Sequence, residues 1–520
     1  MHSAAEAIIR TLDARGPSTD ALRRASDRVR RAGLTSLSKK AKYLILQNLS
    51  ALKIRAARES FWVFCALLYP NYYKESRWHL RLLCEVLQSL YERRLFLADG
   101  RPARKLMINM PPRHGKSRTL ILFCAWLLGK NKKEMIIACS YNDALATDFS
   151  RYTRDEIQKV KNIPLDVVYS DIFPASKIKH GDASYLRWAL QGQHFSYLGA
   201  GVGSGITGKG CTVAIVDDPI KDVETAINAH SLEKVWRWYT DTFQSRQEEN
   251  AIEIVNHTRW AEKDPCGRIL SGARAPDWFV LRLDARLASG EMLCPDLLSL
   301  EKYLELKDTM SPEILNANYH QKPMTLTGRM YKAFRTYKIS ELPEGRIISY
   351  ADTADEGSDY LAAFVAVEHG DDLYILDAVY TQAPMEITEP LLSDMYIKYG
   401  VNYAVIESNN GGKSFARSVR RIIKERREKM RGVHSKTVVA WKHNAQNKHV
   451  RIYTQSAYVQ QHVYFPEGWK HLHPELYTAL AEYQKSGNNK HDDAPDAVTG
   501  LVEIMGKGKG AELEAADAIM

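Results

Sequence analysis

The segment from Met110 to Ser117, with the sequence MPPRHGKS, constrains the fold more than any other part of the chain. It lies between the apolar run Lys105–Asn109 and an apolar stretch over residues 118–128. A Gly-Lys-Ser sequence that opens a helix brings backbone amides and the helix dipole to phosphate oxygens, with lysine on the β/γ-phosphates and serine on Mg²⁺. The usual spacing requires glycine where Met110 stands, so an ordinary loop entering a helix is the alternative. The expected nucleotide-binding residues are Arg113, His114, Gly115, Lys116, Ser117 and Arg118.

A second apolar segment, over residues 211–219, ends in the adjacent carboxylates Asp217 and Asp218. In a parallel sheet, such a strand delivers acids to the edge where Mg²⁺ bound to a phosphate loop is anchored. Asp217 fits the metal role, and Asp218 is suited to align the attacking water. The strand expected over residues 134–140, followed by a helix from Asn142, gives the βαβ rhythm of a nucleotide-binding α/β domain. A chance apolar strand ending in acids is the alternative.

Residues 199–210 contain six glycines, and we interpret them as a mobile loop. Lys209 on this loop is a candidate to reach the γ-phosphate held by a neighbouring subunit, although a plain flexible connector explains it equally well. The next apolar strand, over residues 251–260, ends in Thr258 and Arg259. A polar pair at such a strand tip can sense the γ-phosphate.

Charge and length narrow the class of protein. The chain has 520 residues, enough for about three domains, and a net charge of +10. Residues 1–60 hold 13 Lys or Arg against 5 Asp or Glu, a net of +8. This arm contacts DNA or a partner subunit, or is a solvated basic helix pair. The seven scattered cysteines favour reduced thiols in the cytosol and no structural zinc. We expect no membrane span and no signal peptide.

Two further segments have a less specific pattern. Residues 61–97 are aromatic and helical, and they either cover an adenine ring or form core, the commoner role. Around residues 311–328 the periodicity weakens and prolines appear, which favours a linker.

A second domain follows. A strand over residues 346–352 ends in Asp352, and two alternating strands, 361–368 and 373–380, are joined by a hairpin at 369–372. A helix over 386–399 precedes a strand over 403–407 that ends in Glu407.

A late helix near residues 490–498 places Asp493 and Asp496 on one face. Acids at these elements are typical of a ribonuclease H-like arrangement, in which two Mg²⁺ or Mn²⁺ ions lie about 4 Å apart. Each acid alone is also a plain strand-end or helix-cap carboxylate. His491 is expected on the surface, and Lys448 and Arg451, on a helix from Asn447, are exposed helical charges or contacts to a DNA backbone.

Taken together, these motifs resemble the large terminase subunits of tailed double-stranded DNA bacteriophages. They occur in that family's order over about 400 residues: residues 110–117, 215–219, 257–260, 350–352 and 491–497. The resemblance implies a P-loop NTPase domain of the ASCE or helicase-like type with a parallel sheet, followed by a ribonuclease H-like nuclease domain. We expect a basic helical arm at 1–60, the motor domain at 61–325, a linker at 326–345, the nuclease at 346–505 and a flexible tail at 506–520.

The resemblance also implies roles for single residues. Lys116 and Ser117 bind nucleotide and Mg²⁺, Arg113 binds phosphate and Asp217 binds metal. The family's activating acid is often glutamate, so Asp218, or less readily Glu224, serves here. Thr258 and Arg259 match the coupling motif. The acids that match the nuclease site are Asp352, Glu407 and either Asp493 or Asp496.

The implied activity is that of a packaging motor. ATP hydrolysis drives duplex DNA through the portal into a procapsid, and the nuclease cuts concatemers. The implied partners are double-stranded DNA, the small terminase subunit, the portal protein and further copies of the chain in a ring, in the host cytoplasm and docked transiently on the procapsid. Two rivals remain: an ATP-dependent helicase-nuclease of DNA repair, and a non-catalytic, nucleotide-regulated DNA-binding assembly protein.

Overall fold

The computed structural model describes residues 50–163, 166–181, 184–325, 327–353, 360–408, 412–429, 437–444, 446–487 and 489–507. Most of the basic arm expected at 1–60 and most of the tail expected at 506–520 therefore lie outside the described residues. Residues 50–59 are helical. The chain divides into two compact units, Met1–Met324 and Thr325–Met520, and each is described by itself.

The first unit is built on a seven-stranded sheet in the order β3-β4-β2-β5-β6-β1-β7. All neighbouring strands are parallel except the pair β3 and β4. Strand β6 lies between β1 and β5, the order that the helicase-like expectation requires. The strands are β1 (Lys105–Asn109), β2 (Ile136–Ser140), β3 (Arg187–Trp188), β4 (Tyr197–Gly201), β5 (Cys211–Asp217), β6 (Gln247–Asn256) and β7 (Trp278–Arg282).

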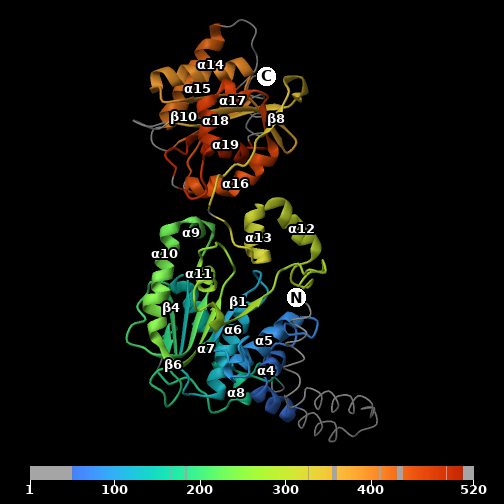
Figure 1. Cartoon of the computed structure of the whole chain (residues 1–520), viewed down its shortest axis with the longest axis vertical. Coiled ribbons are helices and arrows are strands. Elements are labelled where there is room, and N and C mark those ends of the chain that lie inside the picture. The colour runs from blue at the N-terminus through green and yellow to red at the C-terminus, as the bar shows by residue number, and fades with distance from the viewer. Residues whose placement is uncertain are drawn as a thin grey trace. The chain divides into compact units, whose positions relative to one another are not determined.

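Helices cover both faces of this sheet because alternate strand residues point to opposite sides. Ile108 and Ile215 pack with the helices on one face, whereas Met107 and Ala214 pack with those on the other. Figure 1 shows the first group in blue to turquoise and the second in green. The first group comprises α4 (Phe61–Leu68), α5 (Trp78–Tyr91), α6 (Lys116–Lys130), α7 (Asp143–Gln158) and α8 (Tyr169–Ile172). On the other side lie α9 (Val223–Ile227), α10 (Ala229–Arg237), the single turns η2 (Trp238–Phe243) and η3 (Gln244–Arg246), and α11 (Pro265–Ser271).

The expectation for the glycine-rich segment is wrong in part. Its first residues belong to β4, which pairs with β2 inside the sheet. A methyl group at Gly201 would lie 2.6 Å from the backbone nitrogen of Asp143, and one at Gly199 would lie 2.7 Å from the carbonyl of Ala146. These glycines therefore let α7 pack directly on the strand, a role that composition alone does not separate from loop flexibility.

The expected linker at 311–328 is also wrong in part, because it contains a helix. Helix α13 (Pro312–His320) begins at the N-cap Ser311 and packs with α12 (Leu300–Thr309) around a small core that includes Tyr303 and Leu315. Proline at the first turn of a helix needs no partner for its missing amide, so Pro312 starts this helix instead of preventing it.

The second unit holds another seven-stranded sheet, in the order β13-β12-β9-β10-β11-β14-β8. Strands β9, β10 and β11 are antiparallel, and β12 runs parallel to β9, as the sequence predicts. The strands are β8 (Arg335–Tyr337), β9 (Arg346–Asp352), β10 (Leu361–His369), β11 (Asp372–Thr381), β12 (Tyr403–Glu407), β13 (Val438–Lys442) and β14 (Val463–Pro466).

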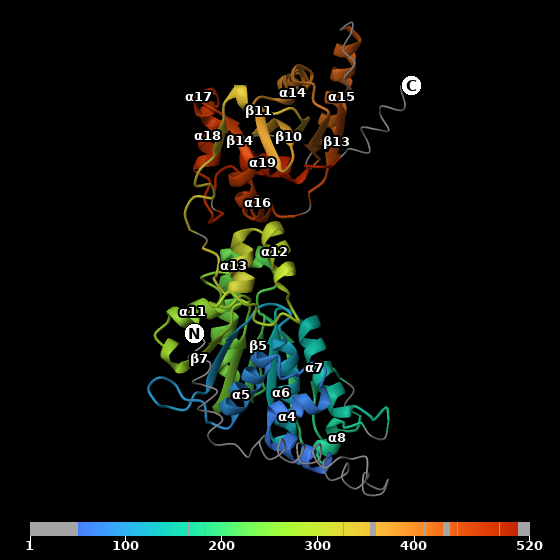
Figure 2. The same cartoon turned by 90° about the vertical axis from the view of Figure 1, so that its right-hand side faces the viewer.

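Helices cover both faces of this sheet as well (Figure 2). One face carries α14 (Met385–Tyr399) and α15 (Gly412–Lys429), packed on Ala363 and Val365. On the other, α19 (Asp493–Glu503) contacts β9, β10 and α16 (Lys448–His462), with α17 (Trp469–Leu472) and α18 (Pro474–Ala481) beside it. A methyl group at Gly500 would lie 2.2 Å from the ring of Tyr350, so this glycine lets α19 approach β9 closely.

The aromatic segment is mostly core. Phe61, Trp62 and Tyr73 are buried. The guanidinium carbon of Arg118 lies 4.8 Å from the ring centroid of Tyr69 and 4.2 Å from that of Tyr72. All seven cysteines lie in the described part of the chain, buried and without a disulfide.

Candidate active sites

The phosphate loop lies where the sequence predicts it, between β1 and α6. Gly115 is the N-cap of α6, and Tyr72 Oη and Leu80 occupy the space that a side chain at this position would need. The loop also places Arg113 in a left-handed conformation with φ of 60°, and its side chain is exposed. Backbone amides at the start of a fifteen-residue helix therefore face a position suited to an anion.

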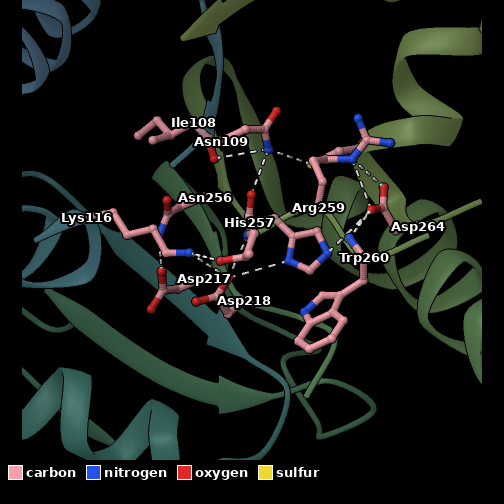
Figure 3. Close-up of polar contacts among 12 residues, drawn as sticks. Ile108, Asn109, Lys116, Asp217, Asp218, Asn256, His257, Arg259, Trp260 and Asp264 are labelled. Atoms are coloured by element: carbon pink, nitrogen blue, oxygen red, sulfur yellow. Dashed lines mark hydrogen bonds and ion pairs between the residues drawn. The ribbon is translucent and has the colours of Figure 1, made fainter. Parts of the chain in front are cut away.

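Lys116 is buried and held by neighbouring oxygens. Its Nζ donates to the hydroxyl of Thr258 and lies 3.3 Å from Asp218 Oδ1 and 3.5 Å from the carbonyl of Met110. Figure 3 shows the side chain reaching from α6 to Asp218. The residue that replaces the usual glycine thus contributes its carbonyl to the lysine, and Thr258 from the end of β6 completes the contacts.

The two adjacent acids at the end of β5 have different environments. Ser117 Oγ donates to Asp217 Oδ1 at 3.1 Å, and Asn256 Nδ2 donates to the same oxygen. Burial and the neighbouring Asp218 raise the pKa of Asp217 to about 7. For Asp218, burial also acts upward, but Lys116 and His257 outweigh it and hold the pKa well below its usual range.

Asp218 adopts a left-handed backbone conformation, with φ of 43°. Such a conformation is uncommon for residues other than glycine and is found where surrounding contacts hold it. The backbone amide of Thr258 donates to Asp218 Oδ1 at 2.9 Å, and the backbone amide of Asp218 donates to the carbonyl of Asn256. Its carboxylate therefore stays ionised and fixed beside Lys116. Glu224, the less favoured alternative, is exposed on α9.

The segment after β6 separates Thr258 from Arg259. Whereas Thr258 contacts Lys116, the Arg259 guanidinium is paired with Asp264 at 3.0 Å and buried. Figure 3 shows the imidazole of His257 between Asp218, at 3.5 Å, and Asp264, at 3.9 Å. The backbone of Arg259 donates to Gln321 Oε1, which follows α13. This segment thus connects the lysine site with the end of the first unit.

The remaining expected residues of this unit are less central. His114 is buried, with its Nδ1 2.8 Å from the carbonyl oxygen of Pro112, whereas Arg118 is exposed. Lys209 lies two residues before β5, at the amino-terminal edge of the sheet, whereas the phosphate loop lies at the carboxyl-terminal edge. A role for Lys209 on a neighbouring subunit stays a prediction.

In the second unit, three acids from distant parts of the sequence converge. Asp352 ends β9, Glu407 ends β12, and Asp496 is one turn inside α19. One carboxylate oxygen from each lies within 4.8 Å of the others, and all three side chains are buried. Three carboxylates are the donor set that Mg²⁺ and Mn²⁺ prefer, so these residues fit a divalent cation.

Burial makes the ionised form of these acids unfavourable when no metal ion is bound. It raises the pKa of Asp352 to about 7 and that of Asp496 to about 8, although the nearby side chains of Lys448 and Arg451 lower these pKa values. Glu407 accepts hydrogen bonds from Tyr350 Oη at 2.7 Å and from Asn444 Nδ2 at 2.9 Å. A positive charge that binds among these three acids therefore stabilises their ionised form.

The expectation for Lys448 and Arg451 as exposed helical charges is wrong. Lys448 Nζ lies 2.8 Å from Asp352 Oδ2, and Arg451 is 2% exposed with one guanidinium nitrogen 3.0 Å from Asp496 Oδ1. Both belong to the acid cluster because α16 packs along α19. Helical spacing predicts which residues share a face of α16, but not that this face meets an acid cluster.

The choice between the two acids of α19 favours Asp496. Among the described residues, the carboxylate group contains Asp496 and not Asp493. Asp493 is buried and accepts the amide of Tyr360 at 3.3 Å. His491 is half-buried with its ring edge against Tyr360, so it is not a plain surface residue.

With this geometry established, comparison with known proteins identifies the second unit. Residues 349–502 match the family model described as the terminase RNaseH-like domain. This region is therefore similar to the RNaseH-like domain of terminases. The match covers all three converging acids and confirms the resemblance of the chain to large terminase subunits.

Solved terminase structures are also similar to the chain, at low identity. The ADP complex of the large terminase from the thermophilic bacteriophage D6E has 11% identity and a TM-score of 0.39 over 81% of this chain and 98% of that one. The HK97 bacteriophage large terminase has 10% identity and a TM-score of 0.31 over 80% and 94%. The human cytomegalovirus terminase nuclease domain has 11% identity and a TM-score of 0.25 over 35% and 93%.

The low identities and TM-scores of these solved structures give no evidence about the activity of this chain.

No curated protein sequence gave a significant match. Within the described ranges, none of the helices has the length and apolar character needed to cross a membrane.

Several residues around the two sites were not predicted from sequence. Asn256, the last residue of β6, lies beside Asp217, and its position two residues before the predicted polar pair was an available signal. In the second unit, Asn444 and Glu503 were missed because nothing local marks them. They become recognisable only when β12, α16 and α19 are brought together.

Proposed function

We propose that the chain is the motor subunit that packages DNA in a tailed double-stranded DNA bacteriophage, with ATPase and endonuclease activities in one polypeptide. The observation that carries the proposal is the match of residues 349–502 to the terminase RNaseH-like domain, with its three converging acids. A phosphate loop whose lysine meets a strand-end carboxylate precedes it. Neither rival function is favoured by a separate feature of the molecule.

In the motor unit, the buried ammonium of Lys116 and the first amides of α6 bind the β- and γ-phosphates of ATP. Ser117 and Asp217, which already share a hydrogen bond, hold Mg²⁺. Asp218 orients the attacking water and accepts its proton, for which an ionised carboxylate is required. Thr258, in contact with Lys116, senses whether the γ-phosphate is present.

In the nuclease unit, Asp352, Glu407 and Asp496 hold divalent cations, Mg²⁺ or Mn²⁺. When bound, these ions supply an activated water and stabilise the leaving oxygen of a phosphodiester. Tyr350 and Asn444 fix the Glu407 carboxylate. Lys448, partly exposed beside Asp352, neutralises the acids before a cation enters.

The partners follow from packaging. The chain acts on double-stranded DNA, forms a ring with copies of itself, and meets the small terminase subunit and the portal protein in the host cytoplasm. Because phosphate contacts dominate motor binding to DNA, affinity falls steeply with salt and depends little on sequence.

Two single substitutions in the full chain test the proposal. Lys116→Ala abolishes ATP turnover and spares metal-dependent cleavage of supercoiled plasmid, whereas Asp352→Asn abolishes cleavage and spares ATP turnover. Loss of both activities in either variant, with folding unchanged, contradicts two separate sites. A strand-displacement assay on a forked duplex gives no unwinding. ATP-dependent unwinding supports the repair helicase-nuclease instead, and absence of ATP turnover in the wild-type chain supports the assembly protein.

A further inference from the structure

Arg451 is unusual among the basic residues described, because its side chain is 2% exposed and lies among carboxylates. It projects from α16, one turn after Lys448. An arginine cannot lose its charge in a protein and is rarely fully buried unless several partners satisfy its donors. Its position therefore requires an explanation beyond packing.

The guanidinium of Arg451 joins two of the three converging acids. One nitrogen lies 3.0 Å from Asp496 Oδ1 and 3.2 Å from Asp496 Oδ2, and the same nitrogen lies 3.7 Å from Glu407 Oε2. Asp496 comes from α19, whereas Glu407 ends β12. A single rigid group thus bridges ligands that belong to different elements.

A third carboxylate, that of Glu503, also holds the arginine. Arg451 Nε donates to Glu503 Oε1 at 3.1 Å, and a terminal nitrogen donates to Oε2 at 3.2 Å. Burial raises the pKa of Glu503, but Arg451 and Lys442 outweigh it and hold the pKa below its ordinary value. Because Asp496 and Glu503 lie two turns apart on α19, Arg451 is fixed to this helix at two points.

Lys448 differs from Arg451 in access. Its side chain is 34% exposed, and it contacts Asp352 at the open side of the cluster. A cation that enters from solvent displaces the flexible lysine, whereas the buried arginine remains.

We propose that Arg451 is a positioning residue that holds Asp496 and Glu407 in the arrangement required for divalent cation binding. The inference rests on the proposed nuclease function and adds to it a residue outside the ligand set. Groups that orient metal ligands contribute about 10- to 100-fold to metal affinity.

Two effects of Arg451 on cation binding have opposite signs, which makes the inference testable. As a positive charge near the acids it repels a divalent cation, so its removal strengthens binding if charge alone matters. As a positioning group it strengthens binding, so its loss weakens binding. Arg451→Lys separates the two, because the charge is retained and the planar fork is lost.

The experiment measures Mn²⁺ binding to the full chain without nucleotide, by the loss of the electron paramagnetic resonance signal of free Mn²⁺. Binding that disappears in Asp352→Asn defines the nuclease site. We expect Arg451→Lys to weaken binding at that site by about tenfold or more. Equal or tighter binding in a folded Arg451→Lys chain overturns the inference.

Two further variants complete the design. Lys424→Met removes an exposed cation of α15, on the other face of the sheet, and leaves binding unchanged. Glu503→Gln weakens the anchor but retains Arg451, and it decides the question if Arg451→Lys does not fold: several-fold weaker Mn²⁺ binding supports positioning, and unchanged binding overturns it. If the wild-type chain binds no Mn²⁺ that Asp352→Asn abolishes, the proposed nuclease site fails and the inference with it.

Discussion

The two units place acids at the carboxyl ends of parallel strands, but they neutralise them differently. In the first unit, Lys116 serves Asp218 and leaves Asp217 with a pKa near 7. In the second, Lys448 pairs most closely with Asp352, and Arg451 pairs with Asp496.

The difference follows from where the cations come from. Lys116 belongs to the phosphate loop, so the group that we propose binds phosphate also pairs with Asp218. In the proposed function, the lysine exchanges this carboxylate for phosphate oxygens when nucleotide binds. In the second unit, the cations come from α16, a helix without other groups in the site. One of them is exposed enough to leave, and the other is buried. We therefore expect the first site to be stabilised by nucleotide and the second by metal.

The largest expected effect distinguishes the two acids of α19. Asp496→Asn lowers metal-dependent plasmid cleavage by more than about 100-fold, because it removes a ligand and ligand-orienting groups alone are worth about 10- to 100-fold. Asp493→Asn lowers cleavage by less than about tenfold, since Asp493 accepts a backbone amide outside the carboxylate group. Cleavage by purified full chain in Mg²⁺ and in Mn²⁺ measures both. The reverse order would assign the metal to Asp493.

A smaller effect concerns the first site without nucleotide. Asp218→Asn leaves the buried Lys116 without its carboxylate, and we expect the free energy of unfolding to fall by about 1–3 kcal/mol. A bound non-hydrolysable ATP analogue reduces this loss of unfolding free energy, because its phosphate oxygens replace the Asp218 carboxylate as partners of Lys116. Urea unfolding with and without the analogue measures both effects. Glu224→Gln, which changes an exposed acid on α9, is the control and leaves stability unchanged. A deficit of the same size with the analogue bound is incompatible with the exchange of partners.

The smallest effect is in the pH dependence of stability. His79 lies fully buried against His114, and burial together with that histidine lowers its pKa to about 3 from 6.5. Between these values the unfolded chain binds a proton that the folded chain does not. The first unit therefore loses stability as pH falls through this window, by up to about 1.4 kcal/mol per pH unit.

Unfolding in urea at pH 7 and pH 5.5 measures the slope. His79→Leu makes the slope shallower but does not abolish it, because burial lowers the pKa of His114 as well. An unchanged slope in that variant would assign the pH dependence to other groups.

In the second unit, the buried acids change the stability in the opposite direction as pH changes. Because burial raises the pKa values of Asp352 and Asp496 above the ordinary 3.8, the folded state binds the extra protons. Without metal, that unit loses stability as pH rises toward about 8.

The sequence was sufficient for features that arise locally. Helix α7 begins after Asn142, whose side chain accepts the amide of Leu145, and α16 begins after Asn447 in the same way. Strands β5, β9 and β12 end at the predicted acids because an apolar run followed by a carboxylate marks a strand leaving the core. Turn residues predicted the hairpin between β10 and β11.

Segments whose role depends on close packing were predicted less well. The glycines of β4 were interpreted as a loop, because the same residue gives flexibility in a loop and a close helix contact in a strand. Pro312 was interpreted as part of a linker, although at the first turn of a helix it is favourable. For β4 the deciding neighbour, α7, lies elsewhere in the chain, whereas Ser311 and Pro312 set the start of α13 locally.

The sequence by itself determined the phosphate loop, the acids at the strand ends and the order of the two units' elements, because each depends on residues a few positions apart. Only the tertiary structure decided that Asp496 rather than Asp493 joins Asp352 and Glu407, and that Lys448 and Arg451 are their counterions. The ion pairs Lys448–Asp352 and Arg451–Asp496 join residues 96 and 45 positions apart. They are set by how closely α16 packs on α19 and α19 on β9, which no local pattern records.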